Sequence, residues 1–394
     1  MQSRLGFGEF VASSSYILFS RFPAITANAA AGIRLASQEG TSEVFAPFTD
    51  SVEEAQYNEK EAVVDSLRSY SIAKRNQSMA SPAYLPGGGW SQTGEFPFVA
   101  TTEPTGSEIM EWAAYLRNFF RTNAISGMWD EPGMVFSSFS KLSRAEAAFK
   151  NGIMNAHYRS WLEAIPSADL VGLDAPHVGN PWGYMFKGHL LYEPVFEYSY
   201  QAHYINGLLA HLNSPVVLEI GGGFGGLAYH ILRNRGKRPG YVGIELPEKM
   251  LLQAYYLRSN FPDLRIFSYD GSGWPKNAED YDVVLLPNYV LPGVPSSYAD
   301  MVLNFRSLPE MPLATITEYI RQIDRIGRLF FYHENIYKAR GDAGHGIPTV
   351  DFPPLRNFTS IISVESRWLK YGAQSPYPCH ENLLIRNEIL EEAR

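Results

Sequence analysis

The sequence is poor in cysteine, in long apolar runs and in clustered positive charge. Its single cysteine, Cys379, excludes a disulfide within the chain and a zinc site built from paired cysteines. No run of 18 apolar residues occurs, so we expect no membrane span. Lys and Arg number 33 against 41 Asp and Glu and form no basic run, which disfavours nucleic acid as a partner. One cysteine also fits the reducing cytoplasm, where we expect the protein to act.

What is present is a large apolar and aromatic content, 45% and 14% of 394 residues, which is enough for a sizeable core. That length suggests two domains, and we expect a boundary near residue 213. Gly87–Gly89 is not followed by Gly-Lys-Ser/Thr, so it is not a phosphate-binding loop. The sequence leaves the oligomeric state open, a homo-oligomer included.

Residues 1–213 carry mainly helical signals, and we expect a helical domain that covers the substrate. Thr105 with Glu108, and Ser143 with Glu146, have the spacing of a capping box, and Pro194 suits the first turn of a helix. Apolar residues at helical spacing follow each start. The predicted helices are residues 53–75 and helices starting at 105, 143 and 194.

In residues 214–394 apolar strand patterns alternate with helical ones, which predicts an α/β fold with a mostly parallel sheet. The expected strands are residues 216–220, 241–245, 264–267, 281–286 and 328–332, then an antiparallel edge pair at 361–368 and 383–386. The fold class we expect is therefore a Rossmann-like, seven-stranded sheet with an antiparallel edge strand.

A cluster of glycines follows the first of these strands, and such a turn lets a ligand lie against the backbone. Gly221, Gly223 and Gly226 satisfy the dinucleotide fingerprint, with Glu245 at the end of the next strand where a ribose-binding acid belongs. The same stretch, read as Glu219, Gly221, Gly223 and Gly225, satisfies the acid-plus-glycine pattern of S-adenosylmethionine-dependent methyltransferases. The glycines alone admit an NAD(P)-dependent oxidoreductase as well as a methyltransferase.

Three observations favour S-adenosylmethionine. Glu219 puts a carboxylate where a methionyl ammonium needs an anion and a pyrophosphate would be repelled. Asp270 and Gly271 follow the third expected strand, a suitable place for an acid at the adenine edge, and Asn288 and Tyr289 end the fourth. The cofactor-binding set we expect is Glu219, Gly221, Gly222, Gly223, Glu245, Asp270, Gly271, Asn288 and Tyr289.

From about residue 175 to 390 the chain resembles a class I, Rossmann-like methyltransferase, and more narrowly a family of sugar O-methyltransferases found in natural-product gene clusters. The residues that carry the narrower match are Gly179–Pro181, the helix over 198–209, residues 301–311 and Asn335. The resemblance implies S-adenosylmethionine as cofactor and a sugar or glycosylated small molecule as acceptor. Residues 1–170 match no family, and a degenerate, non-catalytic scaffold of the same fold stays an alternative.

Transfer to a sugar hydroxyl needs a group that takes its proton. We expect His333, at the end of the fifth strand, to be the base, with His345 in a glycine-rich loop in reserve. Asn304, Arg306 and Glu310 are expected after the fourth strand, at the start of a helix that overhangs the methyl group. The expected acceptor-binding set is Asn304, Arg306, Glu310, Asn335 and His203, and we expect no metal.

Overall fold

The structure is a computed structural model that describes residues 46–48, 59–87, 101–121, 144–165, 170–181, 183–192, 194–233, 239–338, 346–366, 368 and 379–392. Its centre is an eight-stranded sheet in the order β10-β11-β9-β8-β4-β5-β7-β6. The strands are β4 (Val216–Ile220), β5 (Gly240–Glu245), β6 (Ile266–Ser268), β7 (Val283–Pro287), β8 (Ala299–Phe305), β9 (Gly327–Ile336), β10 (Phe358–Glu365) and β11 (Cys379–Arg386).

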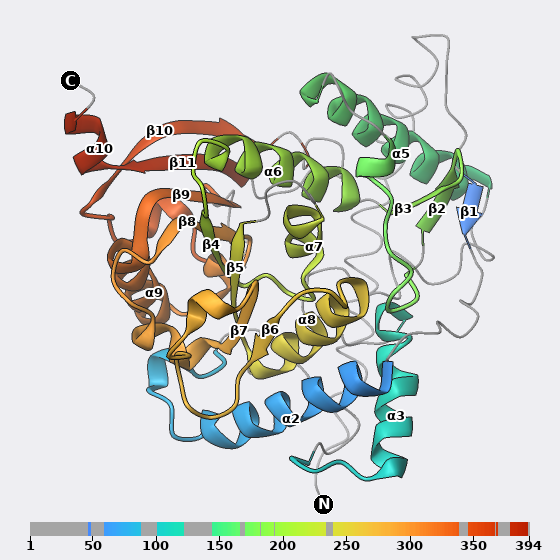
Figure 1. Ribbon diagram of the computed structural model, residues 1–394. Helices are drawn as coiled ribbons and strands as arrows, with labels where there is room; N and C mark the ends of the chain where they lie inside the picture. The colour runs from blue at the N-terminus through green and yellow to red at the C-terminus, as the bar shows by residue number, and fades with distance from the viewer. Residues whose placement is uncertain are drawn as a thin grey trace, which may run out of the picture.

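The strands from β6 to β9 run parallel, and β11 and β10 are added antiparallel at one edge. Figure 1 shows α9 (Leu313–Ile326) on one side of the strands and α7 (Gly226–Leu232) and α8 (Pro247–Asn260) on the other. Apolar residues of β4, β5, β7 and β8 are buried from both sides. Burial on both faces explains why these strands are continuous apolar runs rather than alternating patterns.

The α/β class is confirmed, but the expected number of strands is wrong by one. Residues 299–305, expected to lead into a helix, form β8, which is the parallel neighbour of β4 and brings the sheet to eight strands instead of seven. β7 lies between β5 and β6, so the strand expected at 264–267 forms one edge of the sheet.

β8 was not predicted as a strand because two polar residues, Asp300 and Asn304, interrupt its short apolar run. Both are buried, and hydrogen bonds satisfy both: Asp300 Oδ2 accepts from the backbone N–H of Val216 at 2.8 Å, and its Oδ1 accepts from Arg328 Nε at 2.6 Å. Asn304 is fully buried in the site described below. Buried polar groups with partners are compatible with a central strand, but a sequence pattern does not show those partners.

The front half contributes four helices: α2 (Glu59–Gln77), α3 (Gly106–Leu116), α5 (Arg144–Ala164) and α6 (Pro194–Leu209). Two of them pack on the sheet domain, α2 on α8 and α6 on α7, while α3 packs on α2 and α5 packs on α6. The predicted capping box of α3 is confirmed: the backbone N–H of Glu108 donates to Thr105 Oγ1, and Glu108 Oε2 accepts from the backbone N–H of Thr105. A small antiparallel sheet of β1 (Ala46–Phe48), β2 (Gly183–Phe186) and β3 (His189–Leu191) was not predicted, because its strands have only three or four residues. Gly88 and Gly89 of the glycine run, and Ser143, lie outside the described residues.

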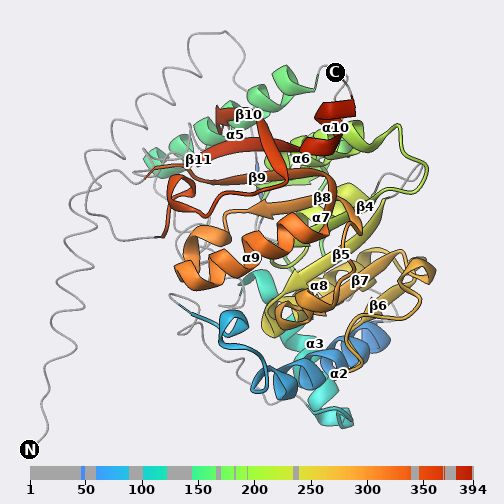
Figure 2. The ribbon, with the colours of Figure 1, turned by 90° about the vertical axis from the view of Figure 1, so that its left-hand side faces the viewer.

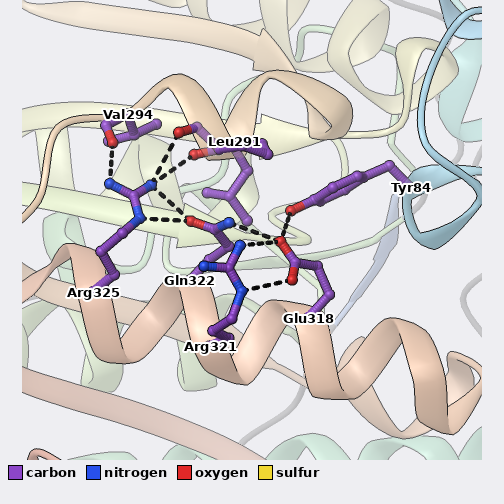
Figure 3. Close-up of polar contacts among 8 residues, drawn as sticks. Tyr84, Leu291, Val294, Glu318, Arg321, Gln322 and Arg325 are labelled. Carbon is purple, nitrogen blue, oxygen red and sulfur yellow. Dashed lines mark hydrogen bonds and ion pairs between the residues drawn. The ribbon is translucent and has the colours of Figure 1, made fainter.

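The short 3-10 helix at Pro82–Tyr84 fastens the front half to α9. Tyr84 Oη donates to Glu318 Oε1 at 2.7 Å, and the same oxygen accepts from Gln322 Nε2 (Figure 3). Arg325 continues the chain of contacts by donating to the carbonyl oxygens of Val294 and Leu291 (Figure 3). In Figure 2, the chain leaves α2 at the bottom of the view and this segment lies beside α9. None of the described helices is long and apolar enough to cross a membrane.

Candidate active site

The glycine turn after β4 has a backbone that only glycine adopts easily. Gly221, Gly223 and Gly225 have positive φ angles of 79°, 60° and 93°. A Cβ at Gly221 would lie 2.2 Å from Ser307 Oγ, and a Cβ at Gly222 would lie 2.6 Å from Glu219 Oε2. Conformation and space therefore both require glycine here, and the Glu219 carboxyl group lies directly against the turn.

Glu219 is almost wholly buried, with 2% of its surface exposed. Tyr241 Oη donates to Glu219 Oε2, and Gln253 Nε2 donates to Tyr241 Oη at 3.0 Å. Burial raises the pKa of Glu219 to about 7, the Tyr241 hydrogen bond opposes that rise, and the charge of Glu245 adds to it. The chain keeps a carboxyl group at this turn that a nearby positive charge would ionise.

Glu245, at the end of β5, reaches the same turn from the neighbouring strand. Its Oε1 accepts from the backbone N–H of Gly223 at 2.6 Å, and its Oε2 accepts from the backbone N–H of Leu246 at 2.8 Å. Burial raises the pKa of Glu245 to about 7, against the effect of those two amides and of Lys249. Burial lowers the pKa of Lys249, and the charges of Glu245, Glu248 and Glu310 oppose that shift, so Glu310 is also near this ammonium. Glu310 thus lies toward the Glu245 side of the turn.

The other expected cofactor residues lie one or two strands away from Glu245. Asp270 is exposed, and its Oδ1 accepts from the backbone N–H and the hydroxyl of Ser272. Because β7 lies between β5 and β6, Asp270 and Gly271 follow the strand that is third from β4 in the sheet. Asn288, at the end of β7, is next to β5 and donates to Tyr84 O and Tyr319 Oη, while Tyr289 Oη donates to Ala73 O. Asn288 and Tyr289 thereby join this edge of the sheet to the front half.

A chain of amide hydrogen bonds runs from the glycine turn to His333. Asn304 Nδ2 donates to the carbonyl oxygen of Ile220 at 2.9 Å, which fixes the orientation of its amide. Asn304 Oδ1 then accepts from Asn335 Nδ2 at 3.0 Å, and the same nitrogen lies 3.2 Å from His333 Nδ1. Since Asn335 offers a donor, Nδ1 must be the acceptor and His333 carries its proton on Nε2.

The structure places His333 in a buried, neutral state. It is 8% exposed, and burial lowers its pKa to about 3. Cross-strand partners share a face of a sheet. Ile220, Asn304 and His333 are partners and lie on one face, while Glu219, Leu303 and Tyr332 lie on the other. His333 therefore lies on the opposite face of the sheet from Glu219, and its neighbour Glu334 lies on the Glu219 face.

Arg306 follows β8 in a left-handed backbone conformation, with φ 61°, which is strained for a side chain of this size. Its backbone N–H donates to Glu334 O at 2.8 Å, and its Nη2 donates to Glu197 Oε1 at 2.5 Å. Its Nε lies 3.8 Å from Glu334 Oε1. Arg306 is thus held between α6 and β9 on the Glu219 face, next to Tyr198, whose ring packs against Gly226.

Several residues of this region were not predicted from the sequence as binding groups. They are Glu197, Tyr241, Gln253, Ser307, Glu334 and Glu381. The available signal was weak: acids and amides inside apolar helices and strands, at positions that sheet register alone brings together. Of the expected residues, His203 is on the exposed side of α6 and is not brought into the site. His345 lies outside the described residues. Within the described part of the chain, no group of three or more His, Cys, Asp or Glu side chains could hold a metal ion.

No protein-family model matches the chain, and no curated protein matches its sequence. Among solved structures, a putative class I S-adenosylmethionine-dependent methyltransferase from Listeria monocytogenes is 9% identical, with 84% of this chain and 88% of that chain covered and a TM-score of 0.34. Magnesium protoporphyrin IX methyltransferase from Synechocystis is 10% identical over 50% of this chain and 85% of its own, with a TM-score of 0.36. A putative sarcosine dimethylglycine methyltransferase from Galdieria sulphuraria is 12% identical over 58% and 97%, with a TM-score of 0.35. At TM-scores below 0.5, these likenesses do not bear on what this chain binds.

Proposed function

We propose that this protein is an S-adenosylmethionine-dependent methyltransferase that acts on a hydroxyl of a sugar or glycosylated small molecule. The observation that carries the proposal is the pair of buried carboxyl groups, Glu219 and Glu245, on the two sides of the glycine turn. The turn follows β4, where the strand order reverses between β5 and β8, and open α/β sheets bind ligands beside such a point.

The charge of this pair favours S-adenosylmethionine over a dinucleotide. Glu219 lies against Gly222, where a pyrophosphate would meet a buried negative charge. An ammonium group would instead be stabilised there. Glu245 accepts hydrogen bonds from two amides and offers acceptors to ribose hydroxyls, as its position at the end of β5 predicts. When bound, this cofactor supplies a methyl group activated by a sulfonium, and the protein must position the acceptor oxygen.

The support for a sugar acceptor is the sequence resemblance together with aromatic side chains on the Glu219 face. Tyr200 and Tyr204 stack along α6 with ring centroids 6.3 Å apart, and Trp368 lies 5.4 Å from Tyr200. Such rings pack against the apolar faces of sugars and other planar ligands. Arg306 is the positively charged group of this face near the turn, next to Tyr198, whereas Asn304 bonds to Ile220 from the opposite face.

Titration calorimetry with S-adenosylmethionine and, separately, with NAD tests the cofactor. We expect binding of S-adenosylmethionine and no comparable binding of NAD, because Glu219 repels a pyrophosphate. Tight NAD binding without S-adenosylmethionine binding would instead support an oxidoreductase. Binding of S-adenosylmethionine with no transfer of a labelled methyl group to any sugar pool would support a non-catalytic scaffold.

The sequence-based choice of base is tested by His333→Ala. If His333 takes the acceptor proton, turnover falls by on the order of 10²-fold with cofactor binding unchanged. The measurement is labelled methyl transfer together with calorimetry on the same preparation. Near-normal turnover would move the role elsewhere, and the buried, neutral state of His333 makes a second candidate worth identifying.

A further inference from the structure

Two buried glutamates oppose each other across the antiparallel pair of β9 and β11. Glu334 and Glu381 are directly paired in register, and they are 1% and 7% exposed. Like charges directly opposite in a sheet destabilise it, and burial increases the cost. A sheet keeps such a pair where one of the two carboxyl groups holds a proton, and an arrangement of this kind is typical of functional sites.

The surroundings of Glu334 hold more negative than positive charge. Glu197 faces it from α6, Arg306 from the end of β8, and Cys379 is near it on β11. Arg306 is the one guanidinium of this group, and Glu197 is its closer partner at 2.5 Å, against 3.8 Å for Glu334. Burial, more than any other cause, raises the pKa of Glu334 to about 8, and the charge of Glu197 adds to the rise.

The two oxygens of Glu334 are treated differently by their neighbours. Ser366 Oγ donates to Glu334 Oε2 at 2.8 Å, whereas Oε1 is buried with no hydrogen-bond donor among the described residues. Glu381 is better satisfied, because Tyr332 Oη and Tyr200 Oη donate to its Oε1 at 2.6 and 3.1 Å. A buried acceptor without a donor is costly, so Glu334 Oε1 is the oxygen suited to bind a proton.

Sheet register puts Glu334 beside the proposed methyl-transfer site. Ile220, Asn304 and His333 are register partners on β4, β8 and β9. The next residue along each strand direction is Gly221 after β4 and Glu334 on β9, so these two residues are aligned across the sheet, two strands apart. Two strand spacings correspond to about 10 Å. Arg306 is next to it, and with 39% of its side chain exposed it is the cluster's most accessible charge. Glu334 thus lies on the acceptor side of β8, on the same face as Glu219.

We propose that Glu334 is the group that accepts the proton of the acceptor hydroxyl, and that Glu197 and Glu381 set its proton affinity. This rests on the proposed function. As the acceptor oxygen bonds to the methyl carbon, the carbon–sulfur bond breaks and its electron pair stays on sulfur. The hydroxyl proton goes to Glu334, which then releases it to solvent. A carboxyl group whose pKa is near the working pH suits this role better than an imidazole that binds a proton only at strongly acidic pH.

The first test needs no acceptor: infrared titration of carboxyl groups in the full chain with isotope-labelled glutamate. We expect a glutamate proton that is lost with a midpoint near pH 8 and is absent in Glu334→Gln. In Glu381→Gln, removal of the opposing charge should lower that midpoint by roughly one pH unit. Glu388→Gln is the matched control, because Glu388 is 76% exposed beyond β11. A signal that survives Glu334→Gln, or that does not shift in Glu381→Gln, would overturn the proposal.

The second test is labelled methyl transfer from S-adenosylmethionine to a sugar pool as a function of pH. Glu334→Gln should lower transfer on the order of 10²-fold with unchanged cofactor affinity, and Glu381→Gln should move the rising limb to lower pH. Normal transfer by Glu334→Gln beside a large loss in His333→Ala would refute the role of Glu334. If the wild-type chain binds no S-adenosylmethionine, the proposed function fails, while the titration still decides the state of Glu334.

Discussion

At the scale of single residues, the site is defined by carboxyl groups that burial makes hard to ionise. Glu219 and Glu245 border the glycine turn and Glu334 lies two strands away, and burial raises the pKa of all three above the ordinary range of a carboxyl group. In the unfolded chain these carboxyl groups ionise near pH 4.5, whereas in the folded chain they ionise only near pH 7 to 8. The free energy of unfolding therefore falls as pH rises through this range. A bound cation reverses that cost at Glu219, which is why we propose a positively charged ligand group beside the glycine turn.

Glu219→Gln should weaken S-adenosylmethionine binding by about tenfold or more, because the ammonium loses its anionic partner. In the wild-type chain the affinity should rise as pH increases toward about 7 and then level off, since binding requires the ionised carboxyl group. The variant should lose much of this pH dependence. Calorimetry between pH 5.5 and 8.5 measures both, and equal affinities for the two proteins at pH 8 would contradict the assignment.

At the scale of elements, β4, its glycine turn and β8 act as one unit. Ser307, just after β8, occupies the space beside Gly221 that a side chain would need, and Asn304 bonds to the last carbonyl group of β4. The turn is therefore shaped from two strands at once. A change in the turn should disturb the acceptor side through the Asn304–Asn335 hydrogen bond.

Gly221→Ala should lower the free energy of unfolding by about 2 kcal/mol or more, because a Cβ would combine a positive φ with contact to Ser307. Gly207→Ala is the control. Gly207 is an exposed position of α6 where a Cβ meets nothing within 4 Å, and alanine there should stabilise the helix by up to about 1 kcal/mol. Urea unfolding measures both, and similar effects of the two substitutions would show that the turn is not strained.

At the scale of the whole molecule, the front half is part of the structure that forms the site. α2 packs on α8, where Lys74 Nζ bonds to Glu248 Oε1 at 2.5 Å, and the residues of α2 belong to one apolar core with those of β4 and β5. Tyr84 contacts two elements of the sheet domain. Its hydroxyl donates to Glu318 of α9, and its backbone carbonyl oxygen accepts from Asn288 at the end of β7. The expected boundary near residue 213 stays a prediction about independent folding.

Tyr84→Phe should lower the free energy of unfolding by about 1 kcal/mol, since a 2.7 Å bond between a buried tyrosine and Glu318 is lost. Arg321→Gln removes a different partner of the same carboxylate, in a pair whose arginine is 61% exposed, and should cost at most about 0.5 kcal/mol. Chemical unfolding gives both values, with limited proteolysis within residues 59–87 as a second readout. A larger cost for Arg321→Gln would contradict a fastening role for Tyr84.

The sequence by itself determined the α/β class, most strand positions, the capped start of α3 and the turn with Glu219 and Glu245, because periodicity, capping and glycine backbone angles are local. Only the tertiary structure decided that β8 lies beside β4, that His333 and Glu219 lie on opposite faces, and that Glu334 opposes Glu381. Those facts depend on strand register. Register brings residues distant in the sequence into contact, such as Ile220 with Asn304 and Glu334 with Glu381. It is fixed by packing and by buried hydrogen bonds such as those of Asp300 and Asn304.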